Sequence, residues 1–272
     1  MGTLYLVATP IGNLEDITLR ALRILAQVSL IAAEDTRRAR ILTDRYEITT
    51  PVTSYFEGNK LAKLETVLRA LDEGDVALIS DAGMPGLSDP GYEFVCAAIE
   101  RSCPVVPVPG PSAPIAALVA SGLPSDSFLY LGFLPRRRSE RRRLLAGVAG
   151  ERRTLIAFEA PHRLRKSLAD FAAVLGERPI AVCRELTKLH EQVWRGTISA
   201  AQTYFAGVEP RGEFTLVIGG APEEKQELWS EERVRAEMDE LVAQGMPRPA
   251  AARLVAAASG WSRSKVYKLG LG

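Results

Sequence analysis

The sequence predicts an α/β protein: two α/β domains with a ligand cleft between them, followed by a small helical domain. Three observations predict this class. Short apolar segments bounded by turn residues recur as far as Ile218, and helical patterns with a period of 3.6 residues lie between them. The apolar segments are continuous rather than alternating, which is typical of strands covered on both faces in a parallel or mixed sheet. After Gly220 the pattern changes to short, charged helices.

The elements of the α/β part follow in chain order. Apolar residues at helical spacing predict helices at Leu61–Leu71 and Leu164–Leu175. The proline-rich segment Val105–Pro114 predicts a strand that ends in a rigid loop, because proline fits neither a helix interior nor a central strand. A helix of small residues then runs to Ser121, and Gly122 ends it. The predicted strands are Leu4–Ala8, Val28–Ala33, Val76–Ile79, Val105–Val108, Phe128–Phe133, Leu155–Phe158, Ile180–Cys183 and Phe214–Ile218.

The C-terminal segment predicts three short helices. Ser230 can cap the first helix and Gly245 ends it, and Ser262 can cap the last. Acidic residues are concentrated in residues 223–240, whereas residues 246–272 contain none. The order of a helix, a glycine-containing turn and a basic helix is typical of a helix-turn-helix. The predicted domains are residues 1–115, 116–222 and 223–272.

The composition of the 272-residue chain excludes several classes of protein. Lys plus Arg is 34 and Asp plus Glu is 33, so the net charge of +1 argues against a globally basic nucleic-acid binder. Three cysteines and two histidines without a Cys-x-x-Cys pair predict reduced thiols and no metal site. The sequence lacks the glycine motifs of P-loop and Rossmann proteins, a signal peptide and an apolar run of ~18 residues. We therefore expect a cytoplasmic protein with no membrane association.

Four loops at predicted strand ends form the candidate ligand site. Their Gly, Pro and small residues let backbone amides and carbonyls approach a ligand closely. Any one of them taken alone is better explained as a turn, but four in succession favour a ligand trough beyond the carboxyl ends of the strands. Asp81 is either a charged anchor for that ligand or part of an Asx turn. The loops are Thr9–Asn13, Ser80–Gly91, Pro109–Ala113 and Phe158–Arg163.

Arginine is concentrated between residues 136 and 153. A charge run is ordinarily a solvated helix face. Here only Glu140 and Glu151 offset it, and unpaired guanidinium groups suit phosphates, so we favour contact with RNA. The net charge of +1 is near zero because this basic segment and a basic tail are balanced by an acidic helix. The candidate RNA-binding residues are Arg37, Arg38, Arg136, Arg137, Arg138, Arg141, Arg142 and Lys188.

Longer motifs occur in order at Val7–Ile17, Glu34–Arg37, Ser80–Gly91, Pro109–Ala113, Ala160–Arg163 and Arg184–Lys188. Together they resemble the ribosomal RNA small subunit methyltransferase I family, a member of the tetrapyrrole methylase superfamily. The resemblance covers essentially the whole chain, including the C-terminal helices. None of the motifs departs from the family pattern.

The resemblance implies two α/β domains of the tetrapyrrole methylase type, with S-adenosylmethionine bound in the cleft between them. The implied reaction is 2′-O-methylation of the cytidine at position 1402 of 16S ribosomal RNA, in the decoding centre. The implied partners are 16S rRNA or the small ribosomal subunit, and family members are usually homodimers. Carried over motif by motif, the cofactor-binding residues are Pro10, Ser80, Asp81, Ala82, Gly83, Ser112, Ala113, Phe158, Glu159, Leu186, Phe214, Thr215 and Leu216.

Methyl transfer to a 2′-hydroxyl needs an aligned oxygen and a group that takes its proton. Asp35 and Glu159 are the candidate catalytic residues, although Asp35 can instead cap a helix and Glu159 can instead bind the cofactor. His162 is better explained as a hydrogen-bond donor at a helix start. Further candidates for the base are Glu34, Glu185 and His190.

Two other functions compete with this reading of the sequence. One is methylation of a small tetrapyrrole, whose negative charges would also suit the arginines. The C-terminal helices and the strings Glu34–Arg37 and Ala160–Arg163 argue against it. The other is RNA binding without catalysis in ribosome assembly, and the intact cofactor-loop motifs argue against that.

Overall fold

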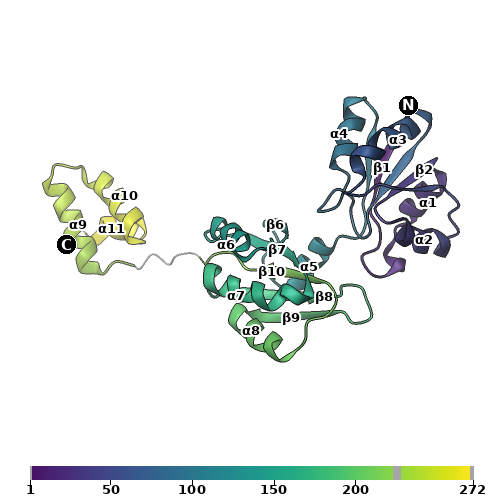
Figure 1. The fold of residues 1–272 in the computed structure, drawn as a ribbon. Coiled ribbons are helices and arrows are strands. Elements are labelled where there is room, and N and C mark those ends of the chain that lie inside the picture. The colour runs from purple at the N-terminus through teal and green to yellow at the C-terminus, as the bar shows by residue number, and fades with distance from the viewer. Residues whose placement is uncertain (1, 223–227, 270–272) are drawn as a thin grey trace. The chain divides into compact units, whose positions relative to one another are not determined.

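This computed structural model describes residues 2–222 and 228–269 of the chain. The chain divides into one compact unit that ends at Ala221 and a second that begins at Pro222. The first unit contains two five-stranded sheets, and the second is helical (Figure 1). The predicted α/β class with C-terminal helices is confirmed. Among the described residues, every helix is too short or too polar to cross a bilayer.

The first sheet is entirely parallel. Its strands lie in the order β3-β2-β4-β1-β5, and β1 is central because Leu4 pairs with Val76 on one side and with Val105 on the other. Parallel neighbours place their carboxyl ends at one edge of the sheet. The loops after β1, β4 and β5 therefore start side by side. The strands are β1 (Leu4–Val7), β2 (Leu30–Ala33), β3 (Val52–Ser54), β4 (Val76–Ile79) and β5 (Val105–Val108).

Helices cover both faces of the first sheet, which explains its continuously apolar strands. Ile31 and Ile79 pack against α1 and α2, whereas Leu4 and Leu78 pack against α3 and α4. Phe94 of α4 is fully buried in the second of these layers. The helices are α1 (Leu19–Gln27), α2 (Thr36–Arg45), α3 (Lys60–Glu73) and α4 (Tyr92–Glu100), with a 3-10 turn at Leu14–Asp16.

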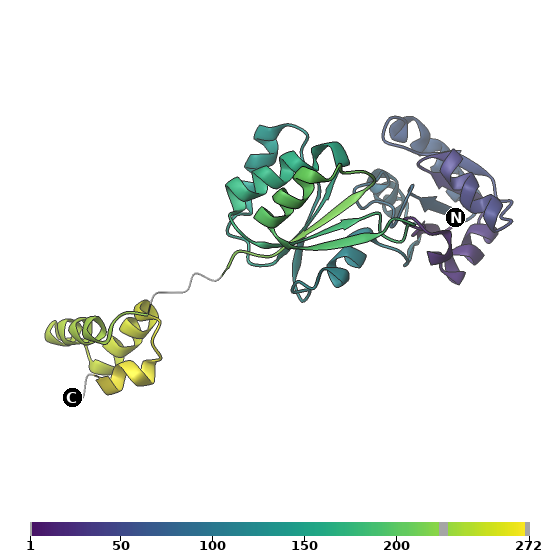
Figure 2. The same ribbon diagram turned by 90° about the horizontal axis from the view of Figure 1, so that it is seen from below.

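The second sheet is mixed, with strand order β6-β7-β10-β8-β9 and one parallel pair, β6 with β7. Helix α5 covers one face and α6, α7 and α8 cover the other (Figure 2). The strands are β6 (Phe128–Phe133), β7 (Thr154–Glu159), β8 (Pro179–Arg184), β9 (Gln192–Thr197) and β10 (Phe214–Ile218). The helices are α5 (Ala113–Ser121), α6 (Arg138–Gly147), α7 (Leu164–Leu175) and α8 (Ile198–Gly207), with a 3-10 turn at Pro161–Arg163.

The predicted strands are all present, with ends that move by a residue or two. Strands β3 and β9 were not predicted: β3 has only three residues, and β9 carries polar side chains at the sheet edge. Helix α5 ends at Gly122 as expected, with φ +77 at that glycine. Its contacts are with the second sheet, so it lies across the predicted boundary at residue 115. The division into residues 1–115, 116–222 and 223–272 stays a prediction.

The second unit is a bundle of α9 (Glu231–Ala243), α10 (Arg248–Ser259) and α11 (Arg263–Leu269). Val234 and Val266 are buried in its small core. The Ser230 hydroxyl accepts a hydrogen bond from the amide of Arg233, so the predicted cap is confirmed. Trp261 is half-buried and donates from its indole to the carbonyl of residue 229, as expected of a core residue. Part of the predicted acidic helix, residues 223–227, lies outside the described residues.

A buried ion pair joins α6 to α7. The Arg141 guanidinium donates to Oδ2 of Asp170 over 2.9 Å from Nε and 2.6 Å from Nη2, and both residues are at most 2% exposed. Arg141 also donates to the carbonyl of Pro135. The expectation that Arg141 contacts RNA is therefore wrong: its stem points into the core, and its charge is used within the fold.

We expect Asp170→Ala to lower the free energy of unfolding by about 3 kcal/mol or more, because it leaves the Arg141 charge buried without a carboxylate. Glu209→Ala is the matched control, since it removes a carboxylate from an ion pair whose side chains are 75% and 72% exposed. It should cost less than about 1 kcal/mol. Urea unfolding measures both. Equal losses for the two variants would contradict the structural role of the pair.

Candidate functional site

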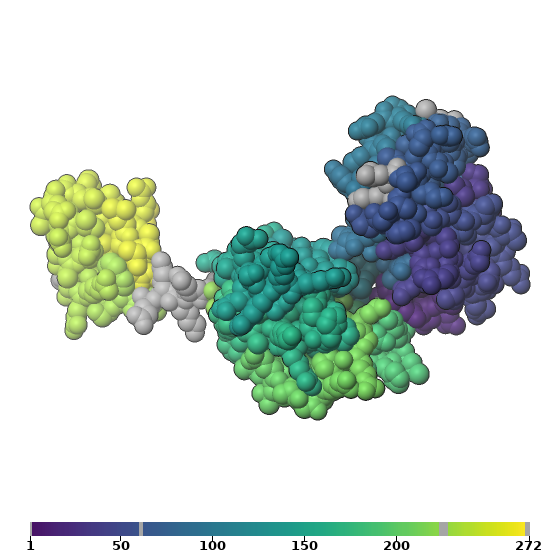
Figure 3. All heavy atoms as spheres, viewed as in Figure 1, coloured from purple at the N-terminus to yellow at the C-terminus, as the bar shows by residue number. Residues whose placement is uncertain are grey.

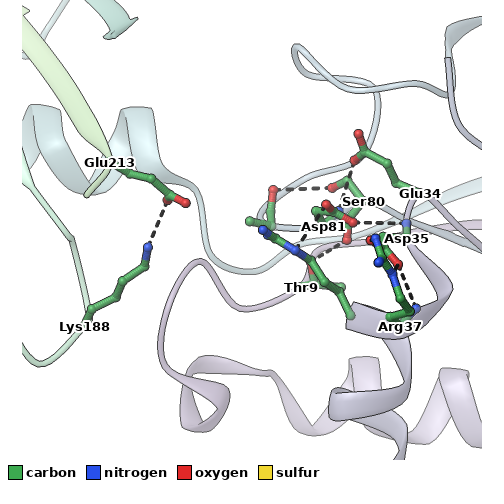
Figure 4. A network of polar contacts seen from close by, with 10 residues as sticks. Thr9, Glu34, Asp35, Arg37, Ser80, Asp81, Lys188 and Glu213 are labelled. Carbon is green, nitrogen blue, oxygen red and sulfur yellow. Dashed lines mark hydrogen bonds and ion pairs between the residues drawn. The ribbon is translucent and has the colours of Figure 1, made fainter. Parts of the chain in front are cut away.

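The loops after β1 and β4 are joined by backbone pairing. Thr9 and Gly83 form an isolated antiparallel bridge, with N–O distances of 2.9 and 3.0 Å. The Thr9 hydroxyl also donates to the carbonyl of Ser80 over 3.1 Å (Figure 4). Gly83 has φ +80, a conformation that L side chains rarely adopt. These contacts fix the two loops relative to each other at the carboxyl edge of the first sheet.

A cleft of about 480 Å³ lies between this edge and the second sheet. That volume is in the usual range for a small-molecule site. The two halves of the first unit form separate lobes in the space-filling view (Figure 3). The walls carry Glu34, Asp81 and Asp89 on the first-sheet side, and on the second-sheet side they are largely apolar apart from Glu159 and Glu213. They are formed by Ile11, Glu34, Asp81, Ala82, Gly83, Met84, Leu87, Ser88, Asp89, Ser112, Ala113, Pro114, Phe133, Phe158, Glu159, Ala160, Pro161, Cys183, Leu186, Gly212, Glu213, Phe214 and Thr215.

Most residues carried over as cofactor-binding line this cleft. They are Asp81, Ala82, Gly83, Ser112, Ala113, Phe158, Glu159, Leu186, Phe214 and Thr215. Pro10 and Ser80 instead line a small cavity next to it, which shares Asp81 with the cleft. Leu216 is fully buried in the core of the second sheet, so its side chain does not line the cleft. Only its backbone, on β10, lies near the site.

The acids of the cleft interact with one another through the loop after β4. Asp81 accepts from the amide of Asp35 over 3.1 Å, and the amide of Asp81 donates to Glu34 over 3.2 Å (Figure 4). The guanidinium of Arg38 lies 3.4 Å from the other oxygen of Asp81. Burial is the main cause that raises the pKa of Glu34, and the charge of Asp81 adds to it. Glu34, which follows β2, is thus held beside Asp81, which follows β4.

Asp89 was not singled out from the sequence, although it lies in the Ser80–Gly91 loop. Burial, followed by repulsion from Glu34 and Asp81, raises the pKa of its carboxyl to about 7. A hydrogen bond from Ser80 opposes the shift. The sequence carries no local sign of this, because the shift depends mainly on burial and on Glu34, which is distant in the chain. An acid with this pKa can accept or donate a proton near neutral pH.

Asp35 is the N-cap of α2. Its carboxylate accepts from the Arg37 amide over 2.8 Å and forms two bonds to the Arg37 side chain, at 3.0 and 2.6 Å. These bonds lower the pKa of Asp35 to about 2. The capping role expected as one of two alternatives is what the contacts support, and so low a pKa makes the carboxylate a weak base.

Glu159 lines the cleft at the end of β7 but is only 2% exposed. Its carboxylate accepts from the Ala160 amide over 2.8 Å and from the Ser167 hydroxyl, and it lies 2.6 Å from Nη2 of Arg163. Both oxygens are therefore engaged by the start of the following helix. This arrangement favours a role for Glu159 in positioning the loop over a role in taking a proton.

The loop after β8 forms the opposite rim of the cleft. Lys188 lies 3.1 Å from Glu213 (Figure 4) and 3.1 Å from Glu185, so its charge is already shared by two carboxylates. Glu185 and Thr187 have φ values of 51 and 64, an uncommon conformation for residues other than glycine. Lys188 was expected to bind RNA, and that role stays a prediction.

The arginine-rich segment begins just after β6, whose last residue, Phe133, lines the cleft. The side chains of Arg137 and Arg138 are 82% and 72% exposed, although each lies within ion-pair distance of one acid. Arg136 and Arg142 are exposed as well. Apart from Arg141, the predicted basic track on this segment is accessible. Arg37 and Arg38 are exposed on α2 at the first-sheet side of the site.

Comparison with known proteins identifies the family. The model described as Tetrapyrrole (Corrin/Porphyrin) Methylases matches residues 3–202. A protein of Synechocystis sp. named ribosomal RNA small subunit methyltransferase I is 49% identical over 273 residues, covering 100% of this chain and 98% of that protein. The Bacillus subtilis protein of the same name is 41% identical over 98% of this chain and 93% of its own length.

Solved structures share the fold of the first unit. The uroporphyrin-III C-methyl transferase of Thermus thermophilus, complexed with S-adenyl homocysteine, has a TM-score of 0.57 at 21% identity, covering 80% of this chain and 97% of that one. A cobalt precorrin-4 methyltransferase has a TM-score of 0.61 at 18% identity, covering 80% and 94%. At these identities the likeness concerns the fold.

We expect the Asp89 carboxyl to titrate with a pKa of about 7 in the free protein. Glu34→Gln should lower this pKa, because it removes a negative charge that favours the protonated form. Carbon-detected NMR of labelled aspartate measures the titration, and Asp89→Asn assigns the signal by its loss. An Asp89 pKa near 4 in the wild type would contradict the burial that the structure gives this carboxyl.

Proposed function

The chain belongs to the tetrapyrrole methylase family, and within it to the ribosomal RNA small subunit methyltransferase I group, and we propose that it methylates the 2′-hydroxyl of cytidine 1402 in 16S rRNA with S-adenosylmethionine. The observation that carries the proposal is the cleft whose walls come from strand-end loops of both sheets. The name of the curated relatives supports an rRNA substrate. The neighbour solved with S-adenyl homocysteine supports the cofactor, since that compound remains after the methyl group has left.

The residues of the cleft fit S-adenosylmethionine. The cofactor supplies an activated methyl group on a positively charged sulfur. Glu34 and Asp81 would complement its positive charges, and Phe158 and Leu186 provide an apolar wall for a flat base. Ala82 and Gly83 have little or no side chain, so they leave backbone groups of the cleft wall accessible to the cofactor. Ser112 and Ala113, at the start of α5, complete the proposed cofactor site.

We assign the removal of the 2′-hydroxyl proton to Asp89 rather than to Asp35 or Glu159. Asp35 is held as a cap with a lowered pKa, and the oxygens of Glu159 are occupied. Asp89 lines the cleft and has a pKa matched to neutral pH. In the proposed step the 2′-oxygen bonds to the methyl carbon, the carbon–sulfur bond breaks with its electron pair staying on sulfur, and the proton passes to the Asp89 carboxylate.

The exposed arginines would hold the RNA backbone. Arg136, Arg137, Arg138 and Arg142 form the proposed track beside the cleft, and Arg37 and Arg38 would extend it. The substrate is 16S rRNA or the small ribosomal subunit, which implies a cytoplasmic enzyme. A homodimer completes the proposal, and the apolar side chains of Ile115 and Val119, 44% and 71% exposed on α5, support it.

Purified protein should transfer labelled methyl from S-adenosylmethionine to small subunits isolated from cells that lack the gene, and mass mapping should place it on the 2′-oxygen of cytidine 1402. Asp89→Asn should lower turnover by about 100-fold or more while retaining cofactor binding, because it removes the proton acceptor. The control is Asp126→Asn, an exposed loop carboxyl before β6, which should keep wild-type turnover.

For the wild type, kcat/KM should rise with pH through about 7, since the acceptor must first lose its own proton. This rise should be lost in Asp89→Asn. Full turnover by that variant would contradict the role of Asp89 alone. A wild type that methylates a tetrapyrrole but no rRNA would support the small-molecule alternative, and one that binds RNA without binding the cofactor would support the assembly factor.

Replacing Arg136, Arg137 and Arg138 by Ala should weaken RNA binding and flatten its salt dependence. Three lost phosphate contacts would reduce the slope of log affinity against log salt by roughly 2. Cofactor affinity, measured by calorimetry, should stay unchanged. The control is a triple Ala variant of Arg20, Arg23 and Arg69, which removes the same charge from exposed positions elsewhere. An equal effect of both triples would show a response to net charge and would contradict a local track.

A further inference from the structure

Phe133 lines the cleft and is 60% exposed. One side of its ring packs on Phe158, with centroids 5.1 Å apart and planes at 56°. Phe158 in turn contacts the ring of Tyr130 edge-on at 5.6 Å. The three rings support one another, and the outer one keeps much of its surface open to solvent. This apolar ring at the cleft is therefore available to a flat group that enters there.

A β-bulge directs Phe133 to the cleft. Tyr130 pairs with Ile156 in the parallel ladder, but Phe133 pairs with Phe158, so β6 has one residue more than β7 over this stretch. The extra residue is accommodated at Gly132, which has φ +66. Without it, side-chain alternation would place Phe133 on the face covered by α6–α8. Bulges of this kind re-aim side chains next to active sites.

The same strand is tied to the loop that carries Asp89. The Tyr130 hydroxyl lies 2.8 Å from the Ser88 hydroxyl, which bridges the two sheets beside that acid. Phe133 therefore belongs to the side of the cleft where the proposed proton acceptor lies. The exposed arginines follow at once in sequence, beginning at Arg136. A nucleotide whose phosphate is held by them would have its base near Phe133.

We propose that Phe133 is the platform on which the target pyrimidine base stacks when its ribose enters the cleft, an inference that rests on the proposed function. Single-stranded bases splayed from an RNA are commonly held on aromatic faces. Stacking accepts any base, so this platform would supply affinity and orientation rather than the identity of the base. The alternative occupant is the adenine of the cofactor, and the two make different predictions.

The test uses the full chain with Phe133→Ala, the conservative Phe133→Tyr, and Phe128→Ala as matched control. Phe128 lies at the other end of the same strand and is 36% exposed. Phe133→Ala should raise KM for small subunits by about tenfold or more, and Phe133→Tyr should restore the wild-type value, because the ring face is what stacks. Affinity for S-adenosylmethionine should stay within twofold of wild type in all variants.

Stacking of the target base can be measured directly with a short decoding-centre RNA whose target cytidine is replaced by fluorescent pyrrolocytidine. Wild type and Phe133→Tyr should quench the probe on binding, and Phe133→Ala should not. Unchanged KM and quenching in Phe133→Ala would overturn the proposal, and so would a loss of cofactor affinity, which would place adenine on this ring. Quenching by a wild type that transfers no methyl to rRNA would refute the proposed function while leaving the platform in place.

Discussion

The structure depends on the alignment of β4, β1 and β5 as neighbouring parallel strands. Because these strands end at one edge, residues from three distant parts of the chain start their loops side by side. The Thr9–Gly83 bridge then locks two of the loops together through the backbone. Both hydrogen bonds of the bridge are made by backbone atoms, since Gly83 has no side chain. The cleft is therefore a consequence of topology first, and its side chains act within a frame that backbone hydrogen bonds have already set.

Much of the fold could be predicted because its signals are local. Ser230 and Gly122 mark helix ends through their own chemistry. The apolar runs of β4 and β10 predict strands without knowledge of the strands they pair with. The cleft loops were predictable for the same reason, since Gly and Pro cluster at strand ends. Strand β9 was not predictable, because it owes its place to pairing with β8 rather than to its own pattern.

The chemistry of the site was harder to predict because charge depends on neighbours. Asp35 and Asp89 are both aspartates in strand-end loops, yet one has a pKa of about 2 and the other about 7. Arg37, two residues away, accounts for the first, and burial together with the distant Glu34 accounts for the second. Arg141 gives the same lesson in the arginine-rich segment: its sequence neighbours are solvated, but its contact with Asp170 on the next helix takes it into the core.

The proposed reaction asks one site to hold a cation and a polyanion close together. An acidic cleft attracts the positively charged cofactor but repels RNA phosphates, and charges of either sign interact strongly at short range. The structure places most of the two sets of charges apart, and they meet at Arg38, 3.4 Å from Asp81. Glu34, Asp81 and Asp89 lie within the cleft, whereas the exposed arginines lie beyond the end of β6. Between these groups in the chain stand the uncharged rings of Tyr130 and Phe133. An uncharged ring can hold a base between a basic surface and an acidic cleft, because stacking does not depend on the sign of the neighbouring charges.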